Sequence, residues 1–140
     1  MSNMSGGLYE PKVLLDETFT LGECPNWDAQ NNRLYWTDIL NCQLHALDVA
    51  TGARKTWTFD SELGCFGLTD QGRLIVALRK DIIYFDPNTD TRTKMATIDD
   101  GINSRTNDGT CLDVGELGVA PHGHGWPITA NLVEWRWTCD

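Results

Sequence analysis

Residues 21–28 read LGECPNWD, and this stretch places one carboxylate, Glu23, between a glycine and a Cys-Pro pair. Pro25 disfavours helical angles at Cys24 and offers no N–H to a neighbouring strand. Trp27 is a large apolar anchor two residues further on. We therefore expect Glu23 to lie where a loop becomes a strand. A carboxylate held in this way is either a ligand for a hard metal ion or the cap of a local turn.

Short strand-like segments separated by turn residues follow this stretch along the chain. Strands are expected at residues 13–15, 33–38, 43–48, 54–59, 74–76, 81–86 and 91–98. The order of turn, Arg-Leu and strand occurs twice. Arg33 belongs to the first copy and Arg73 to the second, 40 positions later. A period of roughly 40 residues with four strands is typical of a propeller blade. We predict an all-β chain that forms about two to three four-stranded antiparallel blades, and a sandwich with two similar halves is the alternative.

Composition limits the classes of partner. The chain has 140 residues, is 41% hydrophobic, and carries a formal net charge of −9 without a basic run. Nucleic acid and anionic membranes are therefore not expected as partners, since both attract clustered Lys and Arg. No secretory signal is visible, and the apolar runs are too short to cross a bilayer. Five cysteines without a Cys-x-x-Cys pair indicate reduced thiols, so we expect a cytoplasmic protein.

A second polar segment, residues 99–109, contains Arg105, Asn107 and Asp108 within four positions. In an extended segment Arg105 and Asn107 point to the same side. Arginine offers a fork of donors and asparagine offers a donor and an acceptor, which suits a polyhydroxylated or carboxylated small molecule. The alternative is an ordinary Asn-Asp-Gly turn with a solvated arginine.

Taken together, these segments resemble the regucalcin/gluconolactonase family, the senescence-marker-protein sugar lactonases. The resemblance covers about Leu21 to Gly109. It is carried by four motifs in order: Leu21-Gly22-Glu23-x-Pro25-x-Trp27, Arg33-Leu34-Tyr35-Trp36-x-Asp38-Ile39, Leu47-Asp48 through Thr51-Gly52, and Arg105-x-Asn107-Asp108-Gly109.

The resemblance implies a six-bladed β-propeller with one divalent cation, Ca²⁺ or Zn²⁺, in its central channel. By the same resemblance Glu23 is a metal ligand, and Arg105 and Asn107 hold a sugar lactone. The implied reaction is lactone hydrolysis, in which the metal polarises the carbonyl or activates a bound water. Some relatives are instead calcium-binding proteins, so a regulatory propeller without turnover is the alternative function.

The sequence departs from the family pattern in two places. Cys24 stands where the family usually has glycine, and the pattern is lost soon after Gly109. We therefore divide the chain into a flexible lead-in at 1–12, propeller blades at 13–110 and a non-matching, irregular tail at 111–140. The later metal ligands, an Asn and an Asp, and an acidic substrate contact have no counterpart, so we expect impaired activity. A truncated or frame-shifted gene product would explain the tail, and reading the other frames of the coding DNA would test this.

The tail allows two further interpretations. His122 and His124 could form a zinc site with Cys111 or Cys139, although the spacing fits no recognised zinc module. A plain interaction module that uses exposed tryptophans such as Trp135 and Trp137 is a third functional class. A partial ring also exposes strand edges and an apolar face, so we expect self-association.

Overall fold

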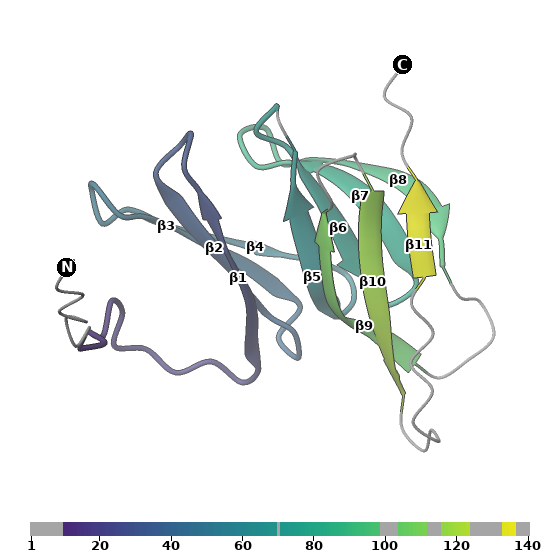
Figure 1. Cartoon of the computed structure of the whole chain (residues 1–140), viewed down its shortest axis with the longest axis horizontal. Coiled ribbons are helices and arrows are strands. Elements are labelled where there is room, and N and C mark those ends of the chain that lie inside the picture. The colour runs from purple at the N-terminus through teal and green to yellow at the C-terminus, as the bar shows by residue number, and fades with distance from the viewer. Residues whose placement is uncertain (1–9, 70, 99–103, 112–115, 124–132, 137–140) are drawn as a thin grey trace, which may run out of the picture.

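The chain forms three antiparallel sheets that follow one another along the sequence (Figure 1). The computed structural model describes residues 10–69, 71–98, 104–111, 116–123 and 133–136. The first sheet contains β1 (Gly22–Asp28), β2 (Arg33–Asp38), β3 (Gln43–Asp48) and β4 (Arg54–Thr58); the second contains β5 (Leu63–Leu68), β6 (Leu74–Leu78), β7 (Asp81–Asp86) and β8 (Thr91–Thr97); the third contains β9 (Ser104–Cys111), β10 (Glu116–Gly123) and β11 (Val133–Arg136). Within these described ranges no helix is long and apolar enough to span a membrane.

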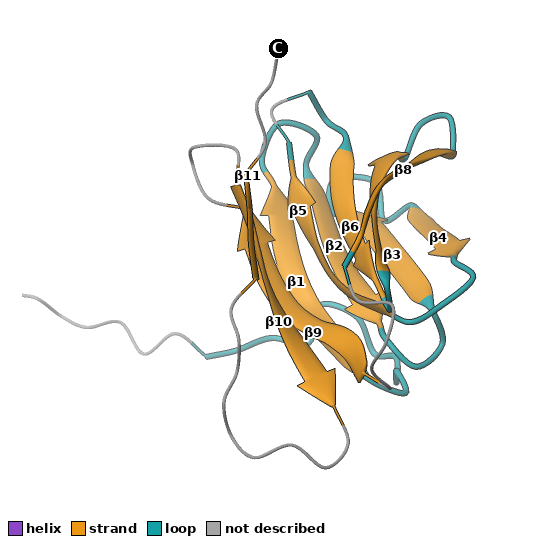
Figure 2. Cartoon of the chain, turned by 90° about the vertical axis from the view of Figure 1, so that its right-hand side faces the viewer, coloured by secondary structure: helices purple, strands orange, loops and turns teal. Residues whose placement is uncertain are grey.

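Each of the first two sheets is a simple up-and-down meander of four strands joined by tight turns. Five turn residues have a positive φ: Asn32 (56°), Cys42 (56°), Gly52 (76°), Gly72 (73°) and Asp90 (58°). All but Cys42 are of the types that adopt this region most readily. The first strands, β1, β5 and β9, lie next to one another (Figure 2). Successive four-stranded meanders with adjacent first strands are the blades of a propeller, which confirms the predicted all-β, partial propeller fold.

Most predicted strands are observed close to their expected bounds, and residues 33–38, 43–48 and 81–86 match them to the residue. The strand predicted at residues 13–15 is wrong. Val13 is 80% exposed, and this segment pairs with no strand of the described chain. An apolar run of three residues is too short to show the two-residue alternation of a strand. It therefore cannot be distinguished from a loop whose apolar residues pack against the protein.

One apolar core joins the first sheet to the second. Its aromatic members alternate between the sheets: Tyr35 and Trp57 stack within the first, and Phe66 and Phe85 contact them from the second, with ring centroids 5.5–6.4 Å apart. Such ring pairs add about 0.5–1.5 kcal/mol each beyond the area that they bury. A smaller cluster on the other face of the second sheet contains Cys65, Ile75, Ala77 and Ile82. The second sheet is therefore buried on both faces.

Residues 10–21, which we call the N-terminal arm, cross the outer face of the first sheet. The Asp38 carboxylate accepts the backbone N–H groups of Thr20 (3.0 Å) and Leu21 (2.9 Å). Phe19 packs edge-on against Trp36 and His45, with centroids 5.6 and 5.1 Å away. Glu17 completes the attachment through an ion pair with Arg54 at 2.7 Å. Backbone, ring and charge contacts all fix the arm to this face.

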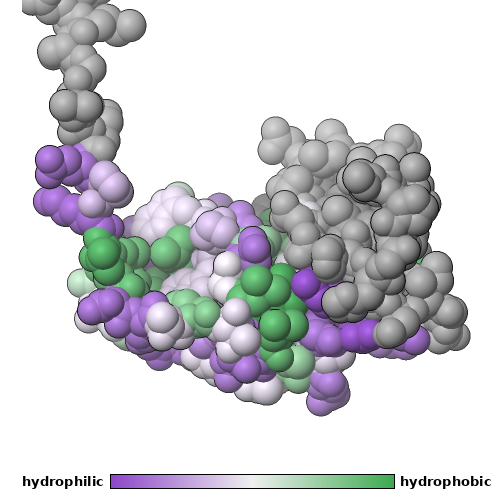
Figure 3. All heavy atoms as spheres, turned by 90° about the horizontal axis from the view of Figure 1, so that it is seen from below, coloured by the Kyte–Doolittle hydropathy of each residue, from purple (hydrophilic) through white to green (hydrophobic). Residues whose placement is uncertain are grey.

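An apolar pocket of about 390 Å³ remains between the arm and the first sheet. Val13 and Leu14 of the arm line it together with Leu34 and Trp36 of the sheet. Figure 3 shows a group of apolar residues, in green, just beyond the hydrophilic residues that adjoin the grey N-terminal trace. The arm therefore covers only part of the outer face.

Candidate active site at the first strands

All three first strands carry a register shift close to their starts. One extra residue enters β1 between Glu23 and Asn26, another enters β5 between Leu63 and Cys65, and Asn107 is unpaired in β9 between Thr106 and Asp108. A β-bulge of this kind bends its strand and re-aims the side chains beside it, and bulges are common next to active sites. The candidate residues Glu23, Arg105 and Asn107 thus lie beside or within these bulges.

Glu23 is the second residue of β1, as the sequence predicts for a carboxylate at a loop-to-strand boundary. Its side chain is exposed, and its backbone carbonyl accepts the Thr37 hydroxyl at 3.2 Å. The carboxylate makes no hydrogen bond or ion pair with any residue of the described ranges, so the turn-cap alternative has no support. Glu23 is therefore anchored through its backbone, and its carboxylate is accessible to a ligand.

Cys24 has a φ of 53°, which is the left-handed region that glycine adopts without cost. Its thiol lies 4.0 Å from the Phe66 carbonyl of β5 and 3.7 Å from the Asn26 amide, which donates to it. Cys24 therefore occupies the bulge of β1 and joins this strand to its neighbour. Its partly buried side chain packs against both core clusters, which offsets some of the backbone strain.

The described residues do not by themselves form a metal site. No three His, Cys, Asp or Glu side chains gather anywhere within the described ranges. Glu23 borders the apolar pocket, which has no other carboxylate in its lining. Because Ca²⁺ takes six to eight oxygen ligands, roughly, one carboxylate does not make a tight site for it. Glu23 has the chemistry of a single ligand for a hard cation, and the described residues provide no cluster that would complete such a site.

Arg105 is the second residue of β9 and is half-buried. Its Nη1 donates to the Thr106 carbonyl at 3.1 Å. Asp108 and Gly109 pair with Ala120 and Val119 of β10, so this segment is a strand and the alternative of an Asn-Asp-Gly turn is wrong. The Asn107 side chain lies outside the described residues. The prediction that Arg105 and Asn107 point to the same side assumed the regular alternation of side chains along a strand. The bulge at Asn107 interrupts that alternation.

Two residues that the sequence analysis did not single out, Thr106 and Gly64, connect β9 to the second sheet. The buried Thr106 hydroxyl lies 3.0 Å from the Ala77 carbonyl and 3.1 Å from the Leu78 carbonyl. A Cβ at Gly64 would stand 2.3 Å from the Thr106 backbone. A glycine inside a strand often marks a close approach of another backbone, and this was the available signal for Gly64. No comparable signal marks Thr106.

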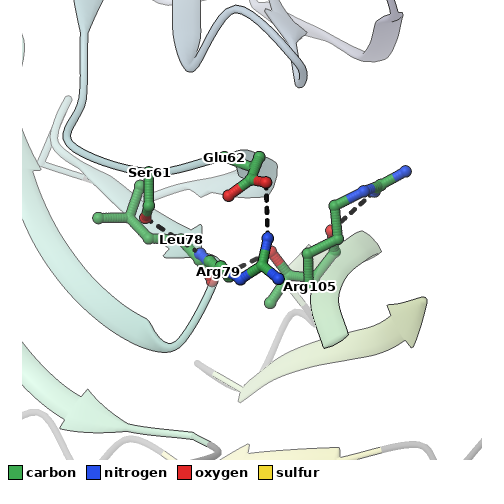
Figure 4. A network of polar contacts seen from close by, with 6 residues as sticks. Ser61, Glu62, Leu78, Arg79 and Arg105 are labelled. Atoms are coloured by element: carbon green, nitrogen blue, oxygen red, sulfur yellow. Dashed lines mark hydrogen bonds and ion pairs between the residues drawn. The ribbon is translucent and has the colours of Figure 1, made fainter. Parts of the chain in front are cut away.

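An ion pair lies beside this contact (Figure 4). The Arg79 Nη1 donates to the Glu62 carboxylate at 2.7 Å, and both side chains are half-buried. The Arg79 backbone N–H lies 3.4 Å from the Ser61 hydroxyl. These bonds tie the end of β6 to the segment that enters β5, and they are next to the carbonyls that receive Thr106.

The zinc site considered for the tail falls mostly outside the described residues. His124 and Cys139 are not described, and only the backbone positions of Cys111 in β9 and His122 in β10 are given. The division at residue 110 also stays a prediction. Within the predicted tail, β10 and β11 pair with each other and β10 pairs with β9.

Residues 21–125 match the family described as the "SMP-30/Gluconolactonase/LRE-like region". The chain is similar to 6-deoxy-6-sulfogluconolactonase of Pseudomonas putida, with 40% identity over 84% of this chain and 38% of the relative. It is also similar to L-arabinolactonase of Azospirillum brasilense, with 32% identity over 71% of this chain and 33% of the relative. The chain thus spans 33–38% of the length of these relatives.

The fold agrees with a solved structure as well. The calcium-binding protein regucalcin from Agrobacterium tumefaciens superimposes with a TM-score of 0.75 at 24% identity, over 80% of this chain and 38% of that one. At this identity the likeness concerns the fold alone. The family match covers most of the chain and includes Glu23, Arg105 and Asn107. The chain therefore belongs to the SMP-30/gluconolactonase/LRE-like family.

Proposed function

We propose that this chain forms the first blades of a metal-dependent sugar lactonase. The observation that carries the proposal is the alignment of three bulged first strands with Glu23 and Arg105 at their starts. Two relatives with sugar-lactonase names support the reaction class. The substrate class is therefore a five- or six-carbon sugar lactone, and the partner is this small molecule.

The residues have separate roles in this proposal. Glu23 supplies one carboxylate to a divalent cation, either Ca²⁺ or Zn²⁺, because it is exposed and has no charged partner in the described part of the chain. Arg105 and Asn107 bind the hydroxyl groups of the sugar through donors and acceptors on β9. When bound, the metal supplies Lewis acidity for attack on the lactone carbonyl. The residues of this chain bind and orient the sugar and balance part of the charge of the cation.

A chimaeric enzyme tests whether these blades can function as part of an active lactonase. Residues 21–108 would replace the matched segment of the Pseudomonas putida lactonase, and hydrolysis of gluconolactone would be followed with and without a chelator. We expect activity that the chelator abolishes, and a loss of about 100-fold in kcat/KM with Glu23→Gln. Asp90→Asn is the control, because this exposed carboxylate pairs with Arg92 in the turn between β7 and β8, away from the bulges. A chimaera in which Glu23→Gln has full activity would contradict the role of Glu23.

The 140-residue polypeptide by itself is expected to bind divalent cations weakly. The described residues provide one candidate ligand, and hard-metal sites need several oxygens. Isothermal titration with Ca²⁺ and with Zn²⁺ should therefore show no tight site. A one-to-one signal below about 1 μM that Glu23→Ala removes would show that this expectation is wrong.

The alternative function is calcium binding without turnover. It is favoured by one observation, the 25% identity of this chain to regucalcin of Xenopus laevis over 70% of this chain. A regucalcin of another organism is named as a calcium-binding protein. The same chimaera distinguishes the two functions. Calcium affinity without lactone hydrolysis supports the alternative, and hydrolysis that depends on the metal supports the lactonase.

A further inference from the structure

We propose that Thr106 and Gly64 are positioning residues for β9, and that they fix the backbone that presents Arg105. The inference rests on the proposed sugar-binding role of Arg105 but concerns different residues. Neither residue is assigned contact with the substrate. Thr106 attaches β9 to the second sheet and Gly64 lies in that sheet, and both roles can be tested without a substrate.

Thr106 holds β9 from within the core. It is 3% exposed, and its hydroxyl lies at hydrogen-bond distance from two consecutive carbonyls, those of Ala77 and Leu78. A hydroxyl has one proton, so the two carbonyls share it or exchange it. Both acceptors belong to the last two residues of β6. The bond therefore joins strands from different sheets, in addition to the pairing of β9 with β10.

Gly64 makes this approach possible. A side-chain carbon at this position would lie 2.3 Å from the Thr106 carbonyl carbon and oxygen and 2.4 Å from its hydroxyl oxygen. Real Cβ contacts are not this short, so any larger residue must push β9 away. Gly64 also lies within the register shift of β5. The backbones of β5 and β9 consequently approach each other closely at Thr106, the residue that follows Arg105.

The acceptors of the Thr106 hydroxyl are themselves restrained. Arg79 directly follows Leu78 and is fixed by Glu62 through its side chain and by Ser61 through its backbone (Figure 4). Arg105 donates to the carbonyl of the anchored residue, Thr106. A displacement of Thr106 therefore changes the direction of the Arg105 backbone and moves one acceptor of its guanidinium.

Amide hydrogen exchange on the 140-residue chain tests the anchoring. Thr106→Val keeps the shape but removes the hydroxyl, and we expect exchange of the β9 amides near Arg105 to rise about tenfold. Thr106→Ser keeps the hydroxyl and should restore protection to within about twofold of the original chain. Gly64→Ala should raise exchange in the same amides. The core amides of β2 and β3 should be unchanged in all three variants.

Thr69→Val is the matched control, because the Thr69 hydroxyl also donates to a carbonyl, that of Arg73 at 2.8 Å, but in the turn between β5 and β6. It should leave β9 unchanged. If Thr106→Val accelerates exchange in β2 and β3 as well, Thr106→Ala replaces it, since alanine adds no bulk beside the carbonyls. Unchanged β9 exchange in Thr106→Val, or in Thr106→Ala when it is the variant used, would overturn the inference.

A second measurement separates the anchoring from the proposed function. The chain is titrated with 1,5-anhydroglucitol, a cyclic polyol that cannot be hydrolysed, while the NMR signal of the Arg105 side chain is followed. We expect a shift that Thr106→Val weakens and Thr106→Ser restores. No shift in the original chain counts against the proposed sugar-binding role, and the exchange result still decides the anchoring. A full shift in Thr106→Val despite faster β9 exchange would overturn the positioning role.

Discussion

Cys24 is a residue whose backbone and side chain have opposing requirements. Its φ of 53° favours glycine, whereas its thiol packs against both core clusters and donates toward the Phe66 carbonyl. A non-glycine residue in the left-handed region costs roughly 1–2 kcal/mol. The conformation follows from the bulge, because one extra residue must fit between Glu23 and Asn26.

We predict that Cys24→Val lowers the free energy of unfolding by about 1–2 kcal/mol relative to Cys24→Gly, since a β-branched residue tolerates the left-handed region least. Urea denaturation followed by tryptophan fluorescence would measure the difference. Cys65→Val is a suitable control, because Cys65 is also a thiol that packs in the core, and more deeply, but it has no positive φ. If valine is as stable as glycine at position 24, the bulge does not impose the strain that we assign to it.

His45 is a buried imidazole that is more stable in its neutral form. It is 6% exposed, stacks on Trp36 at 5.4 Å, and its Nδ1 lies 3.0 Å from the Thr56 hydroxyl. Its Nε2 has no hydrogen-bond partner in the described part of the chain. Burial, and secondly the nearby Arg54 charge, lower the pKa of His45, while the opposing charges of Asp38 and Glu17 raise it less.

We predict that the chain loses stability as the pH falls below about 6.5, the ordinary value for histidine. The unfolded imidazole takes up a proton there while the folded one does not, so stability is present above this pH and declines below it by at most about 1.4 kcal/mol per pH unit. Urea midpoints measured across this range would give the slope. His45→Phe keeps a ring against Trp36 and should flatten the slope. An unchanged slope in His45→Phe would assign the pH dependence to other groups.

Among the elements, the N-terminal arm depends on one carboxylate. Asp38 is 2% exposed and accepts hydrogen bonds from the Thr20 and Leu21 backbones and from the Asn41 amide. Burial acts to raise the pKa of Asp38, but these donors and the proximity of His45 together lower it. The charged form is therefore the one that holds the arm.

We predict that Asp38→Asn costs about 2 kcal/mol of stability, because an amide offers one acceptor oxygen where the carboxylate offers two. Exchange of the Thr20 and Leu21 amides should accelerate more than that of β3. Asp48→Asn is the matched control: Asp48 caps its own turn by accepting the N–H groups of Ala50 and Thr51, and it does not touch the arm. Equal protection of Thr20 and Leu21 in Asp38→Asn and the original chain would be inconsistent with this attachment.

The elements also show which parts of the fold are predictable from sequence. Strands with alternating or aromatic residues, such as 43–48, were located from their period because one face meets the core at every second residue. The bulge at Asn107 was not, because a register shift depends on the partner strand β10. The ligand role of Glu23 stays a prediction from a local motif. Gly64 and Thr106 were not found, because their contact joins two sheets and residues 42 positions apart along the chain.

At the scale of the molecule, the outer face of the first sheet and the strand edges favour association. Val13, Leu14 and Leu40 are 80%, 58% and 52% exposed, and β4 and β8 have one neighbouring strand each in the described sheets. Unpaired edges and apolar faces of this kind promote contact between copies.

We predict that the chain associates with itself as its concentration rises, and that Phe19→Ala increases association because it loosens the arm and exposes Trp36 and His45. Sedimentation velocity over a concentration series would measure both effects. Leu40→Ala should reduce association without loosening the arm. A clean monomer at every concentration, in the original chain and in Phe19→Ala alike, would refute the prediction.

The location of the arm has a kinetic consequence for any neighbour that docks on the first sheet. Phe19 already packs on the rings of Trp36 and His45, so any partner that binds these rings must first displace Phe19. Binding of the partner then requires dissociation of the arm. At high partner concentration the association rate therefore reaches a maximum that equals the rate at which the arm dissociates.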